Sequence, residues 1–200
     1  MLTSSLKRTL SVALAVSLLT AGCAGGVSAP SHDASASAGA ASGDVNSVAL
    51  MPVGPLALPA AEYWAPGEDS SDIATVRVGG CDGESTCPSF AVISGTTATA
   101  IGDGEAYLSD GIDCPGGDAL TPQIASLVSE APTEVAGSSG TLRVFTVSCV
   151  DDDGEDTTSV EQRQWSAGEG ARSVIVVDRW AFADLGDRVA HAQWADDQTQ

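Results

Sequence analysis

The acidic run from Asp151 to Asp156 holds the side chains best suited to metal chemistry in this sequence. It reads Asp-Asp-Asp-Gly-Glu-Asp and is the densest acidic cluster of the chain. Carboxylate oxygens in a tight turn are the ligands that Ca²⁺ prefers. An EF-hand loop does not fit, because aligning Gly154 with its glycine places a cysteine at the first ligand position and a valine at the twelfth. Asp151, Asp153 and Asp156 are therefore weak candidates for a less regular Ca²⁺ site, and a solvated turn is the simpler interpretation.

Side chains that usually carry catalysis are nearly absent. His191 is the only histidine after His32, so a Ser-His-Asp or Cys-His device would depend on it, and we expect its ring to point outward from a helix. No lysine follows Lys7, which excludes Schiff-base chemistry and the phosphate-binding lysine of a P-loop. Gly137-Ser138-Ser139-Gly140 is one residue too short for a nucleophile elbow and indicates a hairpin turn. We assign no catalytic residue, although two of the 27 acids could act together on a glycosidic bond.

The N-terminal residues carry the most specific pattern of the chain. Lys7 and Arg8 precede an apolar run of about ten residues, which is too short to span a bilayer and suits a secretory signal. The next residues, Leu19-Thr20-Ala21-Gly22-Cys23, resemble a bacterial lipobox, with a threonine where a branched aliphatic residue is more usual. The resemblance implies a lipoprotein with a signal peptide over residues 1–22 and acyl chains, such as palmitate, on Cys23. Two acyl chains make a stable anchor, so we expect a location at the extracytoplasmic face of the cell membrane.

The charge of the chain limits its partners. The formal net charge is −19, and loss of residues 1–22, which carry Lys7 and Arg8 but no acid, makes it −21. Such an acidic surface repels phosphate backbones, so we expect no nucleic-acid partner. The bias toward Ala, Gly and Asp, with arginine in place of lysine, resembles the composition of secreted lipoproteins of high-GC Gram-positive bacteria.

Four cysteines follow Cys23, and an even number in an exported domain indicates two disulfides. Three pairings of Cys81, Cys87, Cys114 and Cys149 are possible. A Cys81–Cys87 bond would close a tight loop rich in glycine and acids, which leaves Cys114–Cys149, and we favour this pairing. Zinc is disfavoured because no two of these cysteines have the spacing of a zinc-binding pair.

Composition divides the chain into three parts. Residues 24–44 contain 16 Ala, Gly or Ser among 21, which is too little apolar surface to form a core. Residues 23–44 are therefore expected to be the lipidated cysteine and a flexible tether. Residues 45–200 are expected to form a single extracytoplasmic domain, because this length suffices for one hydrophobic core.

Short β-branched runs separated by Gly and Asp predict strands. The expected strands are Ile73–Val78, Ser89–Ser94, Thr96–Ile101, Thr141–Val150, Thr157–Trp165 and Ser173–Trp180. Four consecutive apolar residues, Val174–Val177, indicate a strand that is covered on both faces and is therefore central. The acidic turn at 151–156 is expected to join two strands as a hairpin.

Two helices are expected beside these strands. In the first, Thr121 could be the cap, Pro122 suits the first position, and Pro132 ends the helix. Its apolar residues at helical spacing are Ile124, Leu127, Val128 and Ala131. A second helix near 184–195 would have Asp184 as its cap and Leu185, Val189 and Ala192 inward, and a strand over 188–194 is the alternative. The fold class is therefore α+β, an antiparallel sheet of five or six strands with one or two helices and two disulfides, or alternatively an all-β sandwich.

These features favour a binding module over an enzyme. The tryptophans that could line a ligand surface are Trp64, Trp165, Trp180 and Trp194, with Trp165 on a partly solvated face and Trp180 in the core. The arginines on expected strands, which we expect to pair with acids, are Arg77, Arg143, Arg163 and Arg179. We expect a lipid-anchored protein that binds a protein or ligand at the cell surface and needs no cofactor. A cell-envelope hydrolase using carboxylates and a calcium-responsive module are the alternatives.

Overall fold

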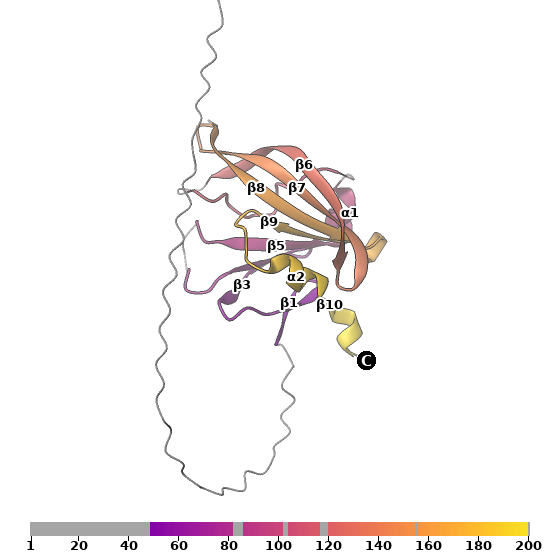
Figure 1. Ribbon diagram of the computed structural model, residues 1–200. Helices are drawn as coiled ribbons and strands as arrows, with labels where there is room; N and C mark the ends of the chain where they lie inside the picture. The colour runs from indigo at the N-terminus through magenta and orange to yellow at the C-terminus, as the bar shows by residue number, and fades with distance from the viewer. Residues whose placement is uncertain (1–48, 82–85, 102–103, 117–119, 155, 200) are drawn as a thin grey trace, which may run out of the picture. The chain divides into compact units, whose positions relative to one another are not determined.

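The computed structural model describes residues 49–81, 86–101, 104–116, 120–154 and 156–199. The expected signal peptide, Cys23 and the expected tether lie outside these residues. All of the described residues fall within the segment that we expected to fold, and their arrangement is drawn in Figure 1.

Ten strands form two antiparallel sheets in the described part of the chain. The smaller sheet has the order β1 (Leu50–Val53), β2 (Leu56–Pro59) and β10 (Gln193–Trp194). The larger sheet has the order β3 (Trp64–Asp69), β4 (Ile73–Val78), β5 (Ser89–Ser94), β9 (Val174–Asp178), β8 (Asp156–Ala167), β7 (Ser138–Val150) and β6 (Thr121–Val135). The helices are α1 (Gly95–Ala100), α2 (Leu185–Ala190) and two 3-10 helices, Gly170–Arg172 and Ala195–Thr199. The antiparallel pairing and the presence of two α-helices are as expected, but one helix lies at another position than predicted, and the prediction of five or six strands was too low.

Strand β9 lies in the middle of the larger sheet, as its run of apolar residues predicts. It pairs with β5 on one side and β8 on the other, and all five of its residues are buried. One face of the sheet shares a core with the smaller sheet and α2, to which Leu58 and Val189 contribute. The other face packs against Ala98 of α1 and Ile112 of the segment 104–116. A strand covered in this way has no polar face, which explains the unbroken apolar run.

Residues 121–132 do not form the expected helix. They belong to β6, which pairs with β7 along its length. The register of this pair shifts twice, between Pro122 and Ile124 and between Leu127 and Ser129. Each shift inserts an extra residue, so residues on one face recur at spacings of three and two instead of a steady two. The apolar residues at helical spacing nevertheless fall on both faces of the strand, with Ile124 and Ala131 in one phase and Leu127 in the other, so the helix prediction was wrong.

The segment Thr96–Ile101 was expected to be a strand, but most of it lies in α1. Gly95 ends β5 because its φ of +60° lies in the left-handed region, which glycine adopts without steric cost. The hydroxyls of Thr96 and Thr97 donate to Asp72 Oδ2 at 3.2 and 2.7 Å. The turn between β3 and β4 therefore holds the first turn of the helix, a contact that local sequence patterns do not reveal.

The second helix is shorter than expected. Helix α2 ends at Ala190, and β10 and a 3-10 helix follow it. Leu185, Val189 and Ala192 are buried as predicted. Asp184 precedes the helix in a left-handed conformation, and its side chain makes no capping hydrogen bond. The predicted cap was therefore wrong, although the inward face was right.

The two disulfides found are those of the favoured pairing. Cys81 is bonded to Cys87 and Cys114 to Cys149, with Cα–Cα distances of 5.6 and 6.1 Å. The second disulfide joins the segment 104–116 to β7, and both of its cysteines are buried in a small core with Phe145. It therefore fixes one end of the segment that forms a wall of the candidate site.

Candidate functional site

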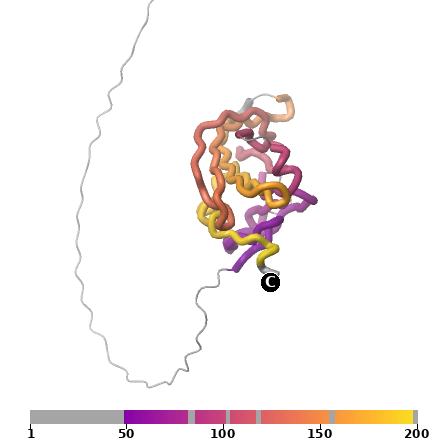
Figure 2. The backbone as a smooth tube through the Cα atoms, turned by 90° about the vertical axis from the view of Figure 1, so that its right-hand side faces the viewer, coloured from indigo at the N-terminus to yellow at the C-terminus, as the bar shows by residue number. Residues whose placement is uncertain are grey.

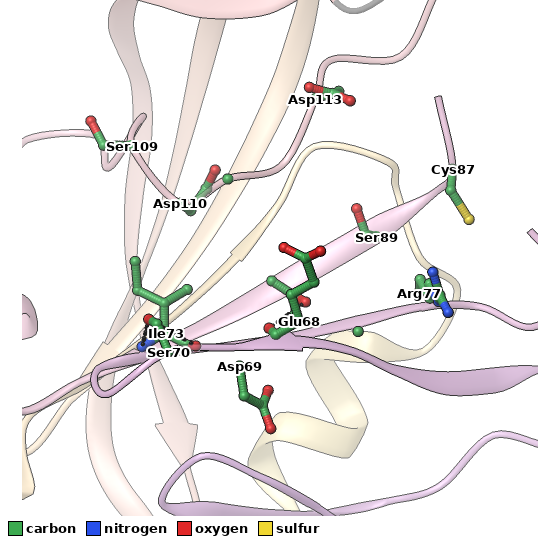
Figure 3. A pocket seen from close by; sticks show the side chains of 13 residues that line it. Glu68, Asp69, Ser70, Ile73, Arg77, Cys87, Ser89, Ser109, Asp110 and Asp113 are labelled. Atoms are coloured by element: carbon green, nitrogen blue, oxygen red, sulfur yellow. Dashed lines mark hydrogen bonds between the residues drawn. The ribbon is translucent and has the colours of Figure 1, made fainter. Parts of the chain in front are cut away.

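A groove of about 500 Å³ lies between β3–β5 of the larger sheet and the segment 104–116, and Figure 3 shows it from close by. The sheet supplies one side and residues 109–113 supply the other. The lining residues are Gly67, Glu68, Asp69, Ser70, Ile73, Thr75, Arg77, Cys87, Ser89, Ser109, Asp110, Gly111 and Asp113. Acids and hydroxyls make up most of this set, so the groove suits a polar ligand better than an apolar one.

Carboxylates give this groove its charge. Glu68 on β3 points toward the side on which Asp110 and Asp113 lie, whereas Asp69 points away, as Figure 3 shows. Thr75 Oγ1 donates to the Glu68 carbonyl oxygen at 2.8 Å, which ties β3 to β4 beneath the Glu68 side chain. Arg77 is the basic residue among those that line the groove. A cationic or hydroxyl-rich group would therefore be bound more readily than an anion.

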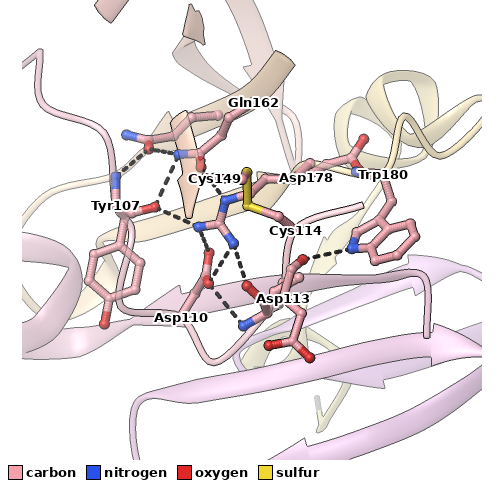
Figure 4. Close-up of polar contacts among 11 residues, drawn as sticks. Tyr107, Asp110, Asp113, Cys114, Cys149, Gln162, Asp178 and Trp180 are labelled. Carbon is pink, nitrogen blue, oxygen red and sulfur yellow. Dashed lines mark hydrogen bonds and ion pairs between the residues drawn. A yellow bond between two sulfur atoms is a disulfide. The ribbon is translucent and has the colours of Figure 1, made fainter. Parts of the chain in front are cut away.

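Arg179 holds the wall of the groove to the sheet, and Figure 4 shows its partners Tyr107, Asp110 and Gln162. Its Nη1 and Nη2 donate to the Oδ1 and Oδ2 atoms of Asp110 at 3.0 and 2.7 Å, and both side chains are fully buried. The same guanidinium donates to the carbonyl oxygens of Tyr107 and Ile112 and to Gln162 Oε1, at 3.1, 2.8 and 2.6 Å. All five N–H donors of the arginine are thereby used. We infer that this wall is a fixed part of the domain.

Burial changes the acidity of the carboxyl groups in this wall. It raises the pKa of Asp113, while the positive charge of Arg179 acts in the opposite direction. It also raises the pKa of Asp110, against the effects of Arg179 and the Ile112 amide. Because Asp110 is committed to Arg179, Asp113 is the wall carboxyl that remains able to exchange a proton with a ligand.

The acidic turn after β7 is separate from this groove. Asp151 Oδ1 accepts a hydrogen bond from the Asp153 amide at 3.0 Å, which is typical of an Asx turn. The side chain of Asp156 is outside those that the structure describes. Within the described part of the chain, no three His, Cys, Asp or Glu side chains are placed to hold a metal ion. A Ca²⁺ site at these aspartates stays a prediction. Comparing the thermal unfolding temperature of the protein with and without Ca²⁺ would test it.

A second groove, of about 410 Å³, lies between α1 and strands β7–β9. Thr141, Arg143 and Ser166 are among its lining residues. Arg143 is committed within the protein, because its Nε donates to Glu130 Oε2 at 2.6 Å and its Nη1 to Ser166 Oγ at 3.4 Å. This groove therefore offers a ligand hydroxyls and the carboxylate of Glu169, while its arginine is already paired.

Exposed hydrophobic side chains gather on β6, which is an edge strand of the larger sheet. Of the four large hydrophobic residues that are exposed in the described chain, three lie here, Ile124 (65%), Leu127 (50%) and Val128 (63%). Figure 2 shows β6, in orange-red, at the outer side of the curved sheet. Sequence reasoning missed this patch because it placed the same residues on the inner face of a helix. The absence of charged residues from 121–129 is the signal that could have indicated it.

The four tryptophans do not form a ligand surface in the structure. Trp64, Trp165 and Trp194 are buried, and Trp180 is half-buried against two of the cores. The expectation that Trp165 lies on a partly solvated face was wrong, because α2 covers that face and Gly186 approaches its ring. Trp180 donates from Nε1 to the Asp113 carbonyl oxygen at 3.0 Å, so it supports the groove from behind.

The predicted pairing of arginines with acids is confirmed at three positions. Arg143 pairs with Glu130, Arg163 with Asp178 and Arg179 with Asp110. His191 is exposed as predicted, and its Nδ1 lies 2.7 Å from the Asp187 carbonyl oxygen at the end of α2. It lines neither groove.

No protein-family model matches the chain, and no curated protein matches it significantly. Across the described residues, the structure contains no helix with the length and apolar character needed to cross a membrane.

Proposed function

We propose that this protein is a lipid-anchored extracytoplasmic interaction module, which binds a protein partner at the cell surface without acting on it chemically. The residues that resemble a lipobox support an anchor at Cys23, and the composition of residues 24–44 supports a tether between that anchor and the domain. Two disulfides in the domain support a location outside the reducing cytoplasm.

The observation that carries an interaction role is the exposed patch of Ile124, Leu127 and Val128. Exposing such side chains to water is unfavourable, and exposed apolar side chains that gather in one place mark interaction sites. Ile124 and Leu127 pair with β7 in opposite phases, so their side chains project from the two faces of this edge, and a partner that binds along the edge would cover both. The patch lies on the uncharged part of β6, although the chain has a net charge of −19. We conclude that a partner protein covers it.

The experiment is chemical crosslinking in native membranes, followed by affinity purification and mass spectrometry. The full chain is compared with Leu127→Asp, which disrupts the patch, and with Tyr63→Asp, which adds the same charge at an exposed residue of similar size elsewhere. We expect one dominant partner that is lost from Leu127→Asp and kept by Tyr63→Asp. A Cys23→Ala form tests the anchor separately, since it should leave the membrane fraction. Equal recovery of all proteins from both charge variants would refute the proposed role of the patch.

A second candidate function, a hydrolase of the cell envelope, is favoured by one observation. Glu68 and Asp113 lie on opposite sides of the acidic groove, and burial raises the pKa of Asp113. A carboxylic acid with a raised pKa beside an ionised carboxylate is the arrangement that glycoside hydrolysis uses. Release of reducing ends from cell-wall glycan by the chain, and its loss in both Glu68→Gln and Asp113→Asn, would support this function. Activity that survives both substitutions would exclude this pair.

A further inference from the structure

The outer edge of β6 offers backbone groups as well as apolar side chains. In an antiparallel pair, residues two positions apart along the partner strand direct their N–H and C=O groups to the same side. Every second residue of β7, from Cys149 to Thr141, pairs in turn with Pro122, Ala125, Leu127, Glu130 and Pro132. These five residues of β6 therefore direct their N–H and C=O groups to the same side of the strand. Proline has no N–H and in sheets occurs where that side of an edge strand faces away from its neighbour. The peptide groups of Ala125, Leu127 and Glu130 accordingly face outward, between the two prolines.

The two edges of the larger sheet differ in their protection. Edge strand β3 is only six residues long and carries Pro66, Glu68 and Asp69, which oppose pairing with another strand. Strand β6 is 15 residues long, and no charge occurs between Thr121 and Ser129. Pro122 and Pro132 bound a window at residues 123–131, within which both register shifts lie. This window has the length of an ordinary strand.

The charge around the window indicates what can occupy it. Glu130 and Glu134 are exposed on β6 itself, and Glu161 is exposed on β8. Arg143, the basic side chain on the neighbouring strand, is already paired with Glu130. A second copy of the chain would bring another net charge of −19 and the same glutamates to this edge, which is unfavourable. A strand with apolar residues opposite 124–128 and lysine or arginine opposite 130–134 complements it.

We propose that β6 is a docking strand, to which an extended segment of a partner protein, apolar at one end and basic at the other, adds as a further strand over residues 123–131. This inference rests on the proposed interaction role and specifies its mode. Backbone hydrogen bonds to Ala125, Leu127 and Glu130 align the segment, and the exposed side chains of Ile124, Leu127 and Val128 pack against its apolar side chains. The exposed Glu134 and the net negative charge of the chain attract its basic end.

The test uses the full chain and a synthetic nine-residue peptide with valines at one end and lysines at the other. Hydrogen–deuterium exchange is followed by mass spectrometry of fragments that cover 121–135. We expect the peptide, at about 1 mM, to slow exchange in these fragments, because even weak strand addition is populated at that concentration. The same peptide with two central prolines and a peptide with glutamate in place of lysine should give no protection. Leu127→Asp should weaken the apparent affinity at least tenfold, and Tyr63→Asp should leave it unchanged.

The other outcomes overturn either the docking proposal or the interaction role, and they tell the two apart. No protection at 121–135 by the valine–lysine peptide excludes this partner chemistry, and equal protection by the proline peptide excludes backbone addition. Slowed exchange that depends on protein concentration without any peptide would show that a second copy is the occupant. If the crosslinked partner requires Leu127 while the peptide gives no protection, strand addition fails and the interaction role stands. If no partner is recovered while the peptide protects β6, the interaction role loses its support and the docking edge remains.

Discussion

Arg179 and Asp110 form an ion pair in which neither side chain is accessible to solvent, with Nη2 2.7 Å from Oδ2. Arg179 follows the central strand β9, and Asp110 lies in the segment that forms one wall of the groove. The pair therefore joins the most buried part of the sheet to the candidate site.

Removing one partner of this pair should strongly lower the free energy of unfolding. Arg179→Met leaves the buried Asp110 carboxylate with the Ile112 amide as its donor but without its ion pair. It also removes the arginine donors to the Ile112 carbonyl oxygen and to Gln162 Oε1. We expect the free energy of unfolding to fall by about 3–5 kcal/mol, measured by urea denaturation monitored by tryptophan fluorescence. The double variant Arg179→Met with Asp110→Leu should recover part of this loss, because no charge is then left buried. A loss below about 1 kcal/mol in the single variant would contradict a structural role for the pair.

The two disulfides should differ in their contributions to stability. The bonded cysteines are 35 positions apart in Cys114–Cys149 and six positions apart in Cys81–Cys87. Loop-closure entropy then predicts losses of about 4 and about 2 kcal/mol when each pair is replaced by serine. Thermal unfolding of the two double variants measures the difference. Equal losses would show that chain entropy does not set the contributions of these bonds.

Asp72 should make stability depend on pH in acid. Hydrogen bonds from the Thr97 side chain, then the Thr96 side chain and the Thr97 amide, lower its pKa below the ordinary value of 3.8, while slight desolvation opposes them. A carboxyl whose pKa is lower in the folded state adds stability above its unfolded pKa, and this stability is lost as pH falls through the folded pKa. Asp72→Asn should therefore flatten the decline in stability below about pH 4, as followed by thermal melting. Asp152→Asn, in an exposed turn, is the matched control and should keep the wild-type slope.

Gly168 should not tolerate a side chain. Its φ is +85°, and an added Cβ would collide with the Arg172 carbonyl oxygen. Gly154 has a similar φ of +78°, but nothing lies near the position of an added Cβ. An alanine at Gly154 therefore measures the cost of backbone strain alone, and an alanine at Gly168 measures backbone strain plus the collision. We expect Gly154→Ala to cost about 1 kcal/mol and Gly168→Ala at least about 2 kcal/mol more, both measured by chemical denaturation. Similar costs at the two positions would show that the loop moves to relieve the collision.

The sequence correctly predicted features that depend on residues close to one another along the chain. The buried strand at 174–178, the hairpin around Asp151, the inward face of Leu185 and Val189, and the favoured disulfides all appear in the structure. The errors at 96–101 and 121–132 arose where a distant contact or a register shift overrode the local pattern. Asp72 holds the residues after Gly95 as a helix, and pairing with β7 holds residues 121–132 as a strand with apolar side chains on both of its faces.

Composition and local pattern by themselves determined the charge, the expected secretion and lipid attachment at Cys23, and the alternation between buried and turn residues. These properties are sums over residues or depend on a few neighbouring positions. Only the tertiary structure decided that Arg179 meets Asp110 across 69 positions of sequence, that Glu68 and Asp113 share a groove, and that β6 is left at an edge with its apolar side chains exposed. Strand order and register bring distant residues together, and the choice among many possible pairings is made by the packing of the whole domain.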